Sequence, residues 1–164
     1  MSVDFEAIAN WLIENAAEHT DLRVLTDQLV GRLQAAGMPI DRLNLGVFAL
    51  HPEMAGYAVL WETGMKTAVE FPIRREDLTQ PTYLDSPIRY VVESKKAVDF
   101  DLSDTAHDED LPVLREFREK GYQQYLGFPI AYGDNGSAVL TICTANSDGF
   151  SADQKNNIQK IFQI

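Results

Sequence analysis

The sequence contains a single cysteine, Cys143, so it cannot form an internal disulfide or a multi-thiolate metal site. Basic residues are also few, because 14 Lys and Arg stand against 25 Asp and Glu, a net charge of −11. This charge repels phosphate backbones and anionic lipid headgroups, so we expect neither nucleic acid nor a membrane as a partner. The apolar runs are far shorter than the ~20 residues of a membrane helix. The N-terminal segment, MSVDFEAIAN, lacks the features of a secretory signal, and the cytoplasm is the expected location.

The chain has the length and composition of one domain. Its 164 residues include 8 Phe, 6 Tyr and 2 Trp, and 45% of the sequence is hydrophobic, which suffices for a sizeable core. No repeat or low-complexity linker divides it, so residues 1–164 are expected to form a single domain. Ser151–Gln154 has the pattern of a capping box, and the helix that it opens reaches Ile164 on an apolar stripe. Because this helix has no stop signal, we expect the chain to be truncated before a downstream domain; the alternative is a short helix that packs back on the core.

The spacing of apolar residues predicts helices and strands in a definite order. Helical periodicity or helix caps occur over 3–16, 20–36, 86–94, 111–121 and 151–164. Strands are predicted at 43–50, 57–61, 67–73, 97–100, 124–132 and 137–144, and the polar segment 74–85, with Pro81, is expected to be irregular. The Asp134-Asn135-Gly136 turn signal and other tight connections imply antiparallel pairing. The predicted fold class is α/β (α+β), with an antiparallel sheet of about six strands flanked by helices.

Four stretches carry a resemblance to a known family. The first is AAGMPIDRLNLGVFALHPEMAGYAVLW, residues 35–61, and the second is Tyr83 followed by Ser86-Pro87. The third runs over 111–129 and ends in YLGFP, and the last is Gly-Phe-Ser at 149–151. In this order and spacing they resemble a GAF domain, and more specifically the GAF-like N-terminal regulatory domain of a bacterial class III adenylate cyclase.

That resemblance implies a sensory role for this chain and catalysis by a domain that follows it. An adenylate (or guanylate) cyclase domain downstream would synthesise the cyclic nucleotide, so this chain itself is expected not to be an enzyme. Class III cyclases form their active sites between two catalytic domains, which favours a homodimer, with the terminal helices as the expected contact. Three alternatives stay open: a ligand-free dimerisation module of a signalling protein, a stand-alone small-molecule-binding GAF protein, and a stand-alone enzyme on the same fold.

A set of mostly aromatic residues forms the candidate ligand pocket. It comprises Trp61, Phe71, Tyr83, Tyr125 and Phe128, with Ser86 and Arg89 as its polar members. Pockets are mostly apolar with few polar groups, although these aromatics would equally suit a filled core. Ser86 caps a helix whose N–H groups could meet an anion, and Arg89 adds a positive charge unless it pairs with Asp85 or Glu93. The resemblance implies that residues 74–110 cover this pocket. The ligand stays unknown, and no cofactor is expected in this chain.

Metal and nucleophile chemistry is weakly represented. Residues 99–104 carry carboxylates in the manner of a metal-binding strand, but a solvated acidic loop over 99–110 is the favoured interpretation. Cys143 lies among apolar residues and is expected to be a buried, unreactive thiol. His51 is the best haem-ligand candidate, yet a structural histidine bonded to a turn is favoured. No histidine has i, i+4 spacing to another ligand, so no metal is expected.

Overall fold

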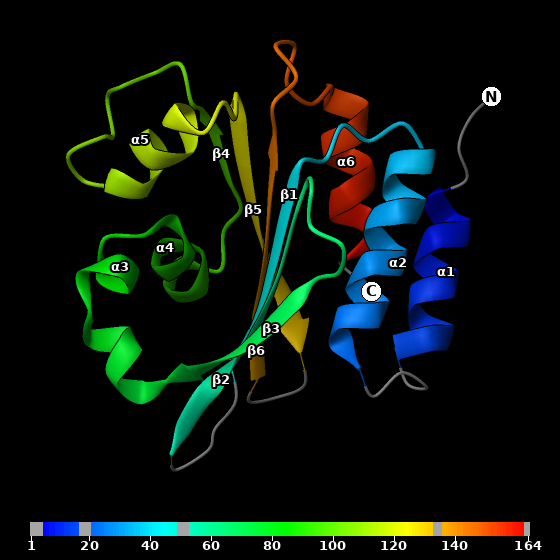
Figure 1. Cartoon of the computed structure of the whole chain (residues 1–164), viewed down its shortest axis with the longest axis horizontal. Helices are drawn as coiled ribbons and strands as arrows, with labels where there is room; N and C mark the ends of the chain where they lie inside the picture. Colours follow the sequence, from blue (N-terminus) through cyan, green and yellow to red (C-terminus); the bar gives the residue numbers. More distant parts are fainter. Residues whose placement is uncertain (1–4, 17–20, 49–52, 133–135, 163–164) are drawn as a thin grey trace.

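The strands form one antiparallel sheet, as the sequence predicts. The computed structural model describes residues 5–16, 21–48, 53–132 and 136–162. The strands are β1 (Arg42–Phe48), β2 (Met54–Glu62), β3 (Val69–Arg74), β4 (Val98–Asp101), β5 (Gln124–Tyr132) and β6 (Gly136–Thr144). Their order in the six-stranded sheet is β3-β2-β1-β6-β5-β4, and all neighbours are antiparallel (Figure 1). Strands β1 and β6 therefore lie side by side at its centre.

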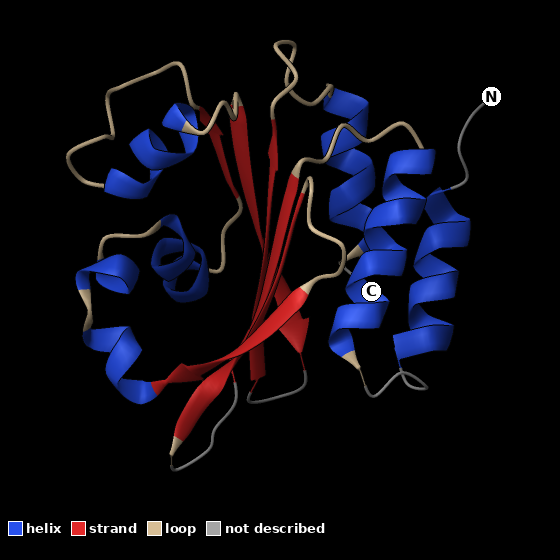
Figure 2. Cartoon of the chain, in the orientation of Figure 1, coloured by secondary structure: helices blue, strands red, loops and turns tan. Residues whose placement is uncertain are grey.

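Helices cover both faces of the sheet. One face carries α1 (Phe5–Ala16), α2 (Leu22–Ala35) and α6 (Ala152–Ile161). The other carries the short helix η1 (Arg75–Thr79), α3 (Pro81–Leu84), α4 (Pro87–Ser94) and α5 (Pro112–Glu119), as Figure 2 shows. Helices α1 and α6, from opposite ends of the chain, touch each other in the first layer. Among the described residues, no helix is long and apolar enough to cross a membrane.

Local sequence signals determine where the helices begin and end. The Asp21 carboxylate accepts a hydrogen bond from the Arg23 backbone N–H at 3.0 Å and caps α2. Gly37, with φ +87°, follows the end of this helix in a conformation that favours glycine. At α6 the predicted capping box is confirmed: Ser151 Oγ accepts from the Gln154 N–H at 3.2 Å, and Gln154 Oε1 accepts from the Ser151 N–H at 2.8 Å. Each such cap stabilises its helix by about 1 kcal/mol.

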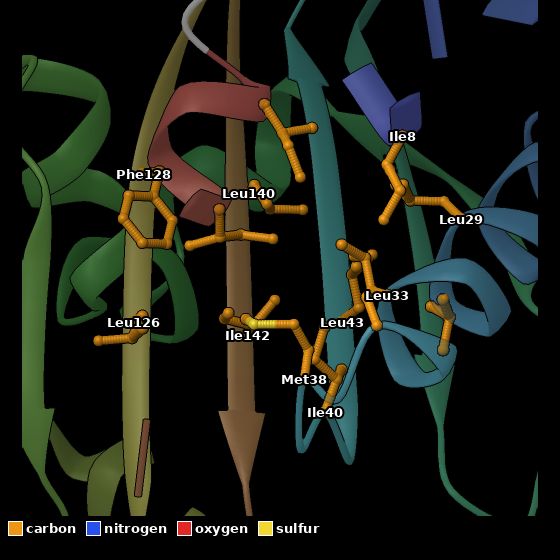
Figure 3. Packing of buried hydrophobic residues seen from close by; sticks show 14 of the residues in the cluster. Ile8, Leu29, Leu33, Met38, Ile40, Leu43, Leu126, Phe128, Leu140 and Ile142 are labelled. Carbon is orange, nitrogen blue, oxygen red and sulfur yellow. The ribbon is translucent and has the colours of Figure 1, made fainter. Parts of the chain in front are cut away.

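The main hydrophobic core lies between the sheet and helices α1, α2 and α6. Alternate residues of the central strands, such as Leu43 on β1 and Ile142 on β6, are almost completely buried there. Leu33 of α2 packs against them from the helix layer (Figure 3). Ile158 of α6 belongs to the same buried cluster. Burying a side chain of this size contributes roughly 1.5–3 kcal/mol, so this core holds the sheet against the helix layer.

A smaller core lies under α5 on the opposite face. The rings of Phe117 and Tyr125 are stacked, with centroids 5.7 Å apart and an interplanar angle of 17°. Leu102, Leu114 and Cys143 complete the buried cluster. These residues cover the β4 side of this face, whereas η1 packs on β2 and β3 and α4 packs on β5 and β6, with α3 between these two helices.

The segment 74–85 is more regular than the sequence predicts. It contains η1 and α3, because Pro81 occupies the first position of α3, where its missing N–H is not needed. Asp77 Oδ2 accepts from the Arg74 backbone N–H at 2.8 Å and closes the start of η1. Two predicted features, His51 and the Asp134-Asn135 turn, lie outside the described residues.

Candidate functional site

A cavity lies on the sheet face opposite the main core. Its floor is a row of small side chains on three neighbouring strands, where Gly46 of β1 lies opposite Ala58 of β2 and Val139 of β6. A Cβ atom added to Gly46 would contact only the Phe48 ring, at 3.6 Å and beyond. Because this row contributes so little side-chain volume, it leaves a cavity of ≈ 470 Å³ above the sheet.

The walls of the cavity come largely from the chain between β3 and α4. Its apolar lining includes Phe48, Phe71, Pro72, Ile73, Leu78 and Ile88, and Asp77, Thr82, Tyr83 and Ser86 are polar members. The Phe48 and Tyr83 rings approach each other, with centroids 6.4 Å apart. Burial raises the pKa of Tyr83, so its phenol is protonated at neutral pH and can donate a hydrogen bond. Apolar walls with few polar groups are typical of small-molecule sites.

Helix α4 is seated on the sheet by a close approach at Gly127. A Cβ there would lie 2.9 Å from Cγ2 of Val98 on β4 and 3.3 Å from Cγ2 of Val91 on α4, so a larger residue would have to displace side chains of both elements. At the start of α4, Ser86 Oγ donates to the Tyr83 carbonyl at 2.6 Å and accepts from the Arg89 N–H at 3.3 Å. These contacts fix the wall that α3 and α4 form.

Two polar side chains of β1 stand at one end of the cavity floor. Arg42 and Asn44 lie on the same face of the strand as Gly46, and both line the cavity. Arg42 Nε donates to Oε1 of Glu62, its register partner on β2, at 3.1 Å. Asn44 is only 8% exposed, and its amide oxygen has no hydrogen-bond partner in the part of the chain that the structure describes. Buried acceptors are normally paired, so this end of the cavity is suited to a polar group from outside the chain.

Of the residues predicted from the sequence, Phe71, Tyr83 and Ser86 line this cavity together. Trp61 lies on the other face of the sheet, since it pairs with Leu43 in register and packs against the main core. Phe128 is buried in the same core (Figure 3). The structure therefore divides the predicted aromatic cluster between the two faces of the sheet.

Tyr125 and Arg89 also lie away from the cavity lining. Tyr125 is buried in the cluster under α5, where burial raises its pKa above the ordinary tyrosine range. Arg89 is exposed on α4, and its Nε donates to Glu93 Oε1 at 2.9 Å while Nη1 donates to the Leu84 carbonyl at 3.2 Å. Its guanidinium thus stabilises the turn between α3 and α4. Of the two carboxylates that the sequence suggests as partners, Glu93 is the one that pairs with it.

Three residues of the cavity, Arg42, Asn44 and Gly46, are not among those predicted from the sequence. The signal that could have found them is the alternation in β1, because Leu43 and Leu45 face the main core and the residues between them must face the other way. An arginine and an asparagine that alternate with core leucines in a central strand must lie on the opposite face of the sheet, beneath the segments that cover that face.

The acidic segment 99–110 begins in β4 and continues as a largely exposed loop, as predicted. Arg118 holds this loop: its terminal amino groups donate to both carboxylate oxygens of Asp108, at 2.8 and 2.6 Å, and its Nε donates to the Leu102 carbonyl. Asp99 forms an ion pair with Lys155 of α6 at 2.6 Å. Within the described ranges, no group of three or more His, Cys, Asp or Glu is arranged to hold a metal ion.

Comparison with solved structures identifies the fold. A phycocyanobilin-bound GAF domain from a cyanobacterial phytochrome is 15% identical, with a TM-score of 0.62, over 99% of this chain and 91% of that one. The GAF domain of a phosphoenolpyruvate-protein phosphotransferase from Coxiella burnetii is 18% identical, with a TM-score of 0.56, over 98% and 89%. An N-acylhomoserine lactone-dependent LuxR-family transcription factor from Burkholderia cenocepacia is 13% identical, with a TM-score of 0.54, over 96% and 88%.

No protein-family model matches the sequence, and no curated protein matches it. At these low identities the structural likeness shows the fold alone. The chain has the GAF fold, which confirms this part of the resemblance drawn from the sequence.

Proposed function

We propose that this chain is a regulatory GAF domain that senses a small organic molecule in the cavity between the sheet and helices η1, α3 and α4. The observation that carries the proposal is the cavity itself, ≈ 470 Å³ in volume, with apolar walls and a floor of small residues. A fold with no use for this space would gain stability by filling it, for example with a larger residue at Gly46. The phycocyanobilin-bound neighbour is an instance of the same fold holding a ligand.

A ligand in this cavity would contact two parts of the chain, the floor and the cover, that differ in how much buried surface holds them in place. The floor belongs to central strands that the main core holds from the other side. The cover consists of short helices, α3 and α4, joined by the Ser86 turn. Binding would therefore act on the cover more than on the floor, because segments with less buried surface change conformation at lower cost.

The output of this sensor is, in our proposal, an adenylate or guanylate cyclase domain that follows α6. This part rests on the resemblance of residues 35–61 and 111–129 to the regulatory domain of class III cyclases. A homodimer would then form through the terminal helices, where α1 and α6 touch and Ile13 is 52% exposed. Equilibrium sedimentation of the wild type against Ile13→Asp tests this contact: weaker association of the variant supports it, and unchanged association contradicts it.

The ligand-free dimerisation module, the stand-alone binding protein and the stand-alone enzyme remain the alternatives, and ligand uptake by the cavity distinguishes the sensor from the first of them. Methyl NMR with 2-phenylethanol, a small neutral molecule, tests whether the cavity takes up a ligand. We expect shifts at Ala58, Ile73 and Val139 and none at Leu33 or Ile158 of the main core. Gly46→Val should abolish these shifts. Unchanged cavity methyls in the wild type, or shifts that persist in the variant, would contradict the sensor proposal.

A further inference from the structure

The guanidinium of Arg42 has hydrogen-bonding capacity that the described residues of the chain do not use. Its side chain is only 13% exposed, and its Nε is committed to Glu62 at 3.1 Å. The guanidinium carbon also lies over the Phe117 ring, 4.7 Å from its centroid, and the Cys143 thiol is a weak acceptor for this side chain. In the described part of the chain no oxygen accepts from its two terminal amino groups. The planar fork of an arginine matches the two oxygens of a carboxylate, so buried N–H groups of this kind suit such a partner.

The charges around Arg42 also leave room for an anion. Glu62 is shared between two cations, because the Lys120 ammonium lies 3.9 Å from the same Oε1 atom that Arg42 contacts. The Tyr122 hydroxyl donates to this oxygen as well, at 3.3 Å. One carboxylate thus faces two positive groups, and a second carboxylate would balance the local charge. Asp77, the acidic residue of the cavity lining, lies on the cover and is held by the Arg74 backbone N–H.

Asn44 supplies a second polar group next to Arg42. It is two residues further along the same face of β1, and its buried amide oxygen has no partner among the residues that the structure describes. Rotation of the side-chain amide exchanges its oxygen and its NH₂ group, so Asn44 can present either a donor or an acceptor to a bound head group. The two side chains together define a polar end of the cavity, whereas Phe48, Phe71 and Ile73 make the rest apolar.

Building on the proposed function, we infer that the cavity binds a small monocarboxylic acid with an apolar body. The carboxylate lies at the Arg42 fork with Asn44 beside it, and the apolar body extends over Gly46 and Ala58 towards Phe48. A ligand with several charges, such as a nucleotide, would place charge against the apolar walls without a partner.

Titration calorimetry with three molecules of matched shape tests this assignment: phenylacetate, phenylacetamide and 2-phenylethanol. We expect phenylacetate to bind at least about tenfold tighter than the other two, because its hydrogen bonds to the guanidinium are charge-assisted. The double variant Arg42→Gln/Glu62→Gln should remove this preference, and because both partners of the ion pair are neutralised, neither is left as an unpaired charge. If that pair does not fold, Arg42→Lys provides the test, since it keeps the charge and loses the fork.

Equal affinities of the three molecules in the wild type, or a preference for phenylacetate that survives in these variants, would overturn the assignment. If neutral and charged molecules bind equally and Gly46→Val abolishes both, the sensor proposal stands and only the carboxylate is wrong. If none of the three binds the wild type, both proposals fail.

Discussion

Gly46 and Ala58 lie directly opposite each other on β1 and β2, so no side chain larger than a methyl group rises from the cavity floor at this pair. On the far side of Gly46, Val139 of β6 continues the row. The cavity is therefore a consequence of residue size at successive positions of the register. It exists because β1 and β2 carry almost no side chain at this pair, under the helices that cover this face.

Replacing Gly46 should separate stability from binding. Gly46→Val fills open space and adds a residue that favours strands, so we expect the unfolding free energy to rise by about 1 kcal/mol and 2-phenylethanol to bind at least about tenfold more weakly. Gly31→Ala is the matched control. Gly31 is an exposed residue inside α2 with no atom near its Cβ position, so this variant should gain about 1 kcal/mol and bind normally. Denaturant unfolding and calorimetry measure both quantities; undiminished binding by Gly46→Val would show that the cavity is not the site.

Asn44→Leu should stabilise the protein and weaken binding of phenylacetate. The substitution removes a buried acceptor that has no partner within the described ranges and keeps a similar shape, so we expect the unfolding free energy to rise by about 1 kcal/mol. Phenylacetate should lose a hydrogen bond and bind several-fold more weakly. Chemical denaturation and calorimetry test this pair of effects. A large loss of stability would mean that Asn44 has a structural partner.

The ion pair between Arg118 and Asp108 should make stability depend on pH in the acidic range. Hydrogen bonds from the Arg118 guanidinium lower the pKa of Asp108. A carboxylate with a lowered pKa stabilises the fold above its unfolded pKa, near about 4, and this contribution is lost as the pH falls through the folded value.

Asp108→Asn should therefore melt below the wild type at pH 7, and the difference should shrink at pH values under about 4. Melting temperatures across the acidic range measure it, with Asp110→Asn, an exposed residue of the same loop, as the control. A difference that is constant with pH would show that the Asp108 charge is not responsible.

Cys143 should be unreactive in the folded protein. It is fully buried, and burial raises the pKa of its thiol to about 12, so almost no thiolate exists at neutral pH. We expect Ellman's reagent to label it only at the rate of unfolding, with fast reaction after denaturant is added. Immediate stoichiometric labelling in native buffer would contradict both its burial and its expected inertness.

The sequence predicts the architecture well because strand alternation and helix caps are local signals. The Ser151 capping box and the antiparallel strands are of this kind. The candidate site is harder to predict from the sequence, because the lining of a cavity depends on which face of the sheet each residue occupies. The sequence places Trp61 and Phe71 in one aromatic set. In the sheet, Trp61 pairs with Leu43 on the face of the main core, whereas Phe71 pairs with Ala58 on the face of the cavity.

The polar end of the cavity depends on register as well as alternation. Arg42 and Glu62 are 20 residues apart and meet only because β1 and β2 pair in this register. Gly46 carries no side chain, so a search for chemically active residues passes over it. Residues that create space are recognised only once their neighbours across the sheet are known.

The most direct test of the cavity as a carboxylate site is a crystal structure of the chain with 4-bromophenylacetate, in which anomalous scattering locates the bromine. We predict the carboxylate within hydrogen-bonding distance of the Arg42 terminal amino groups and the bromine over Gly46 and Ala58. An empty cavity at saturating concentration, a bromine site elsewhere on the protein, or the reverse orientation with bromine beside Arg42 would contradict the assignment.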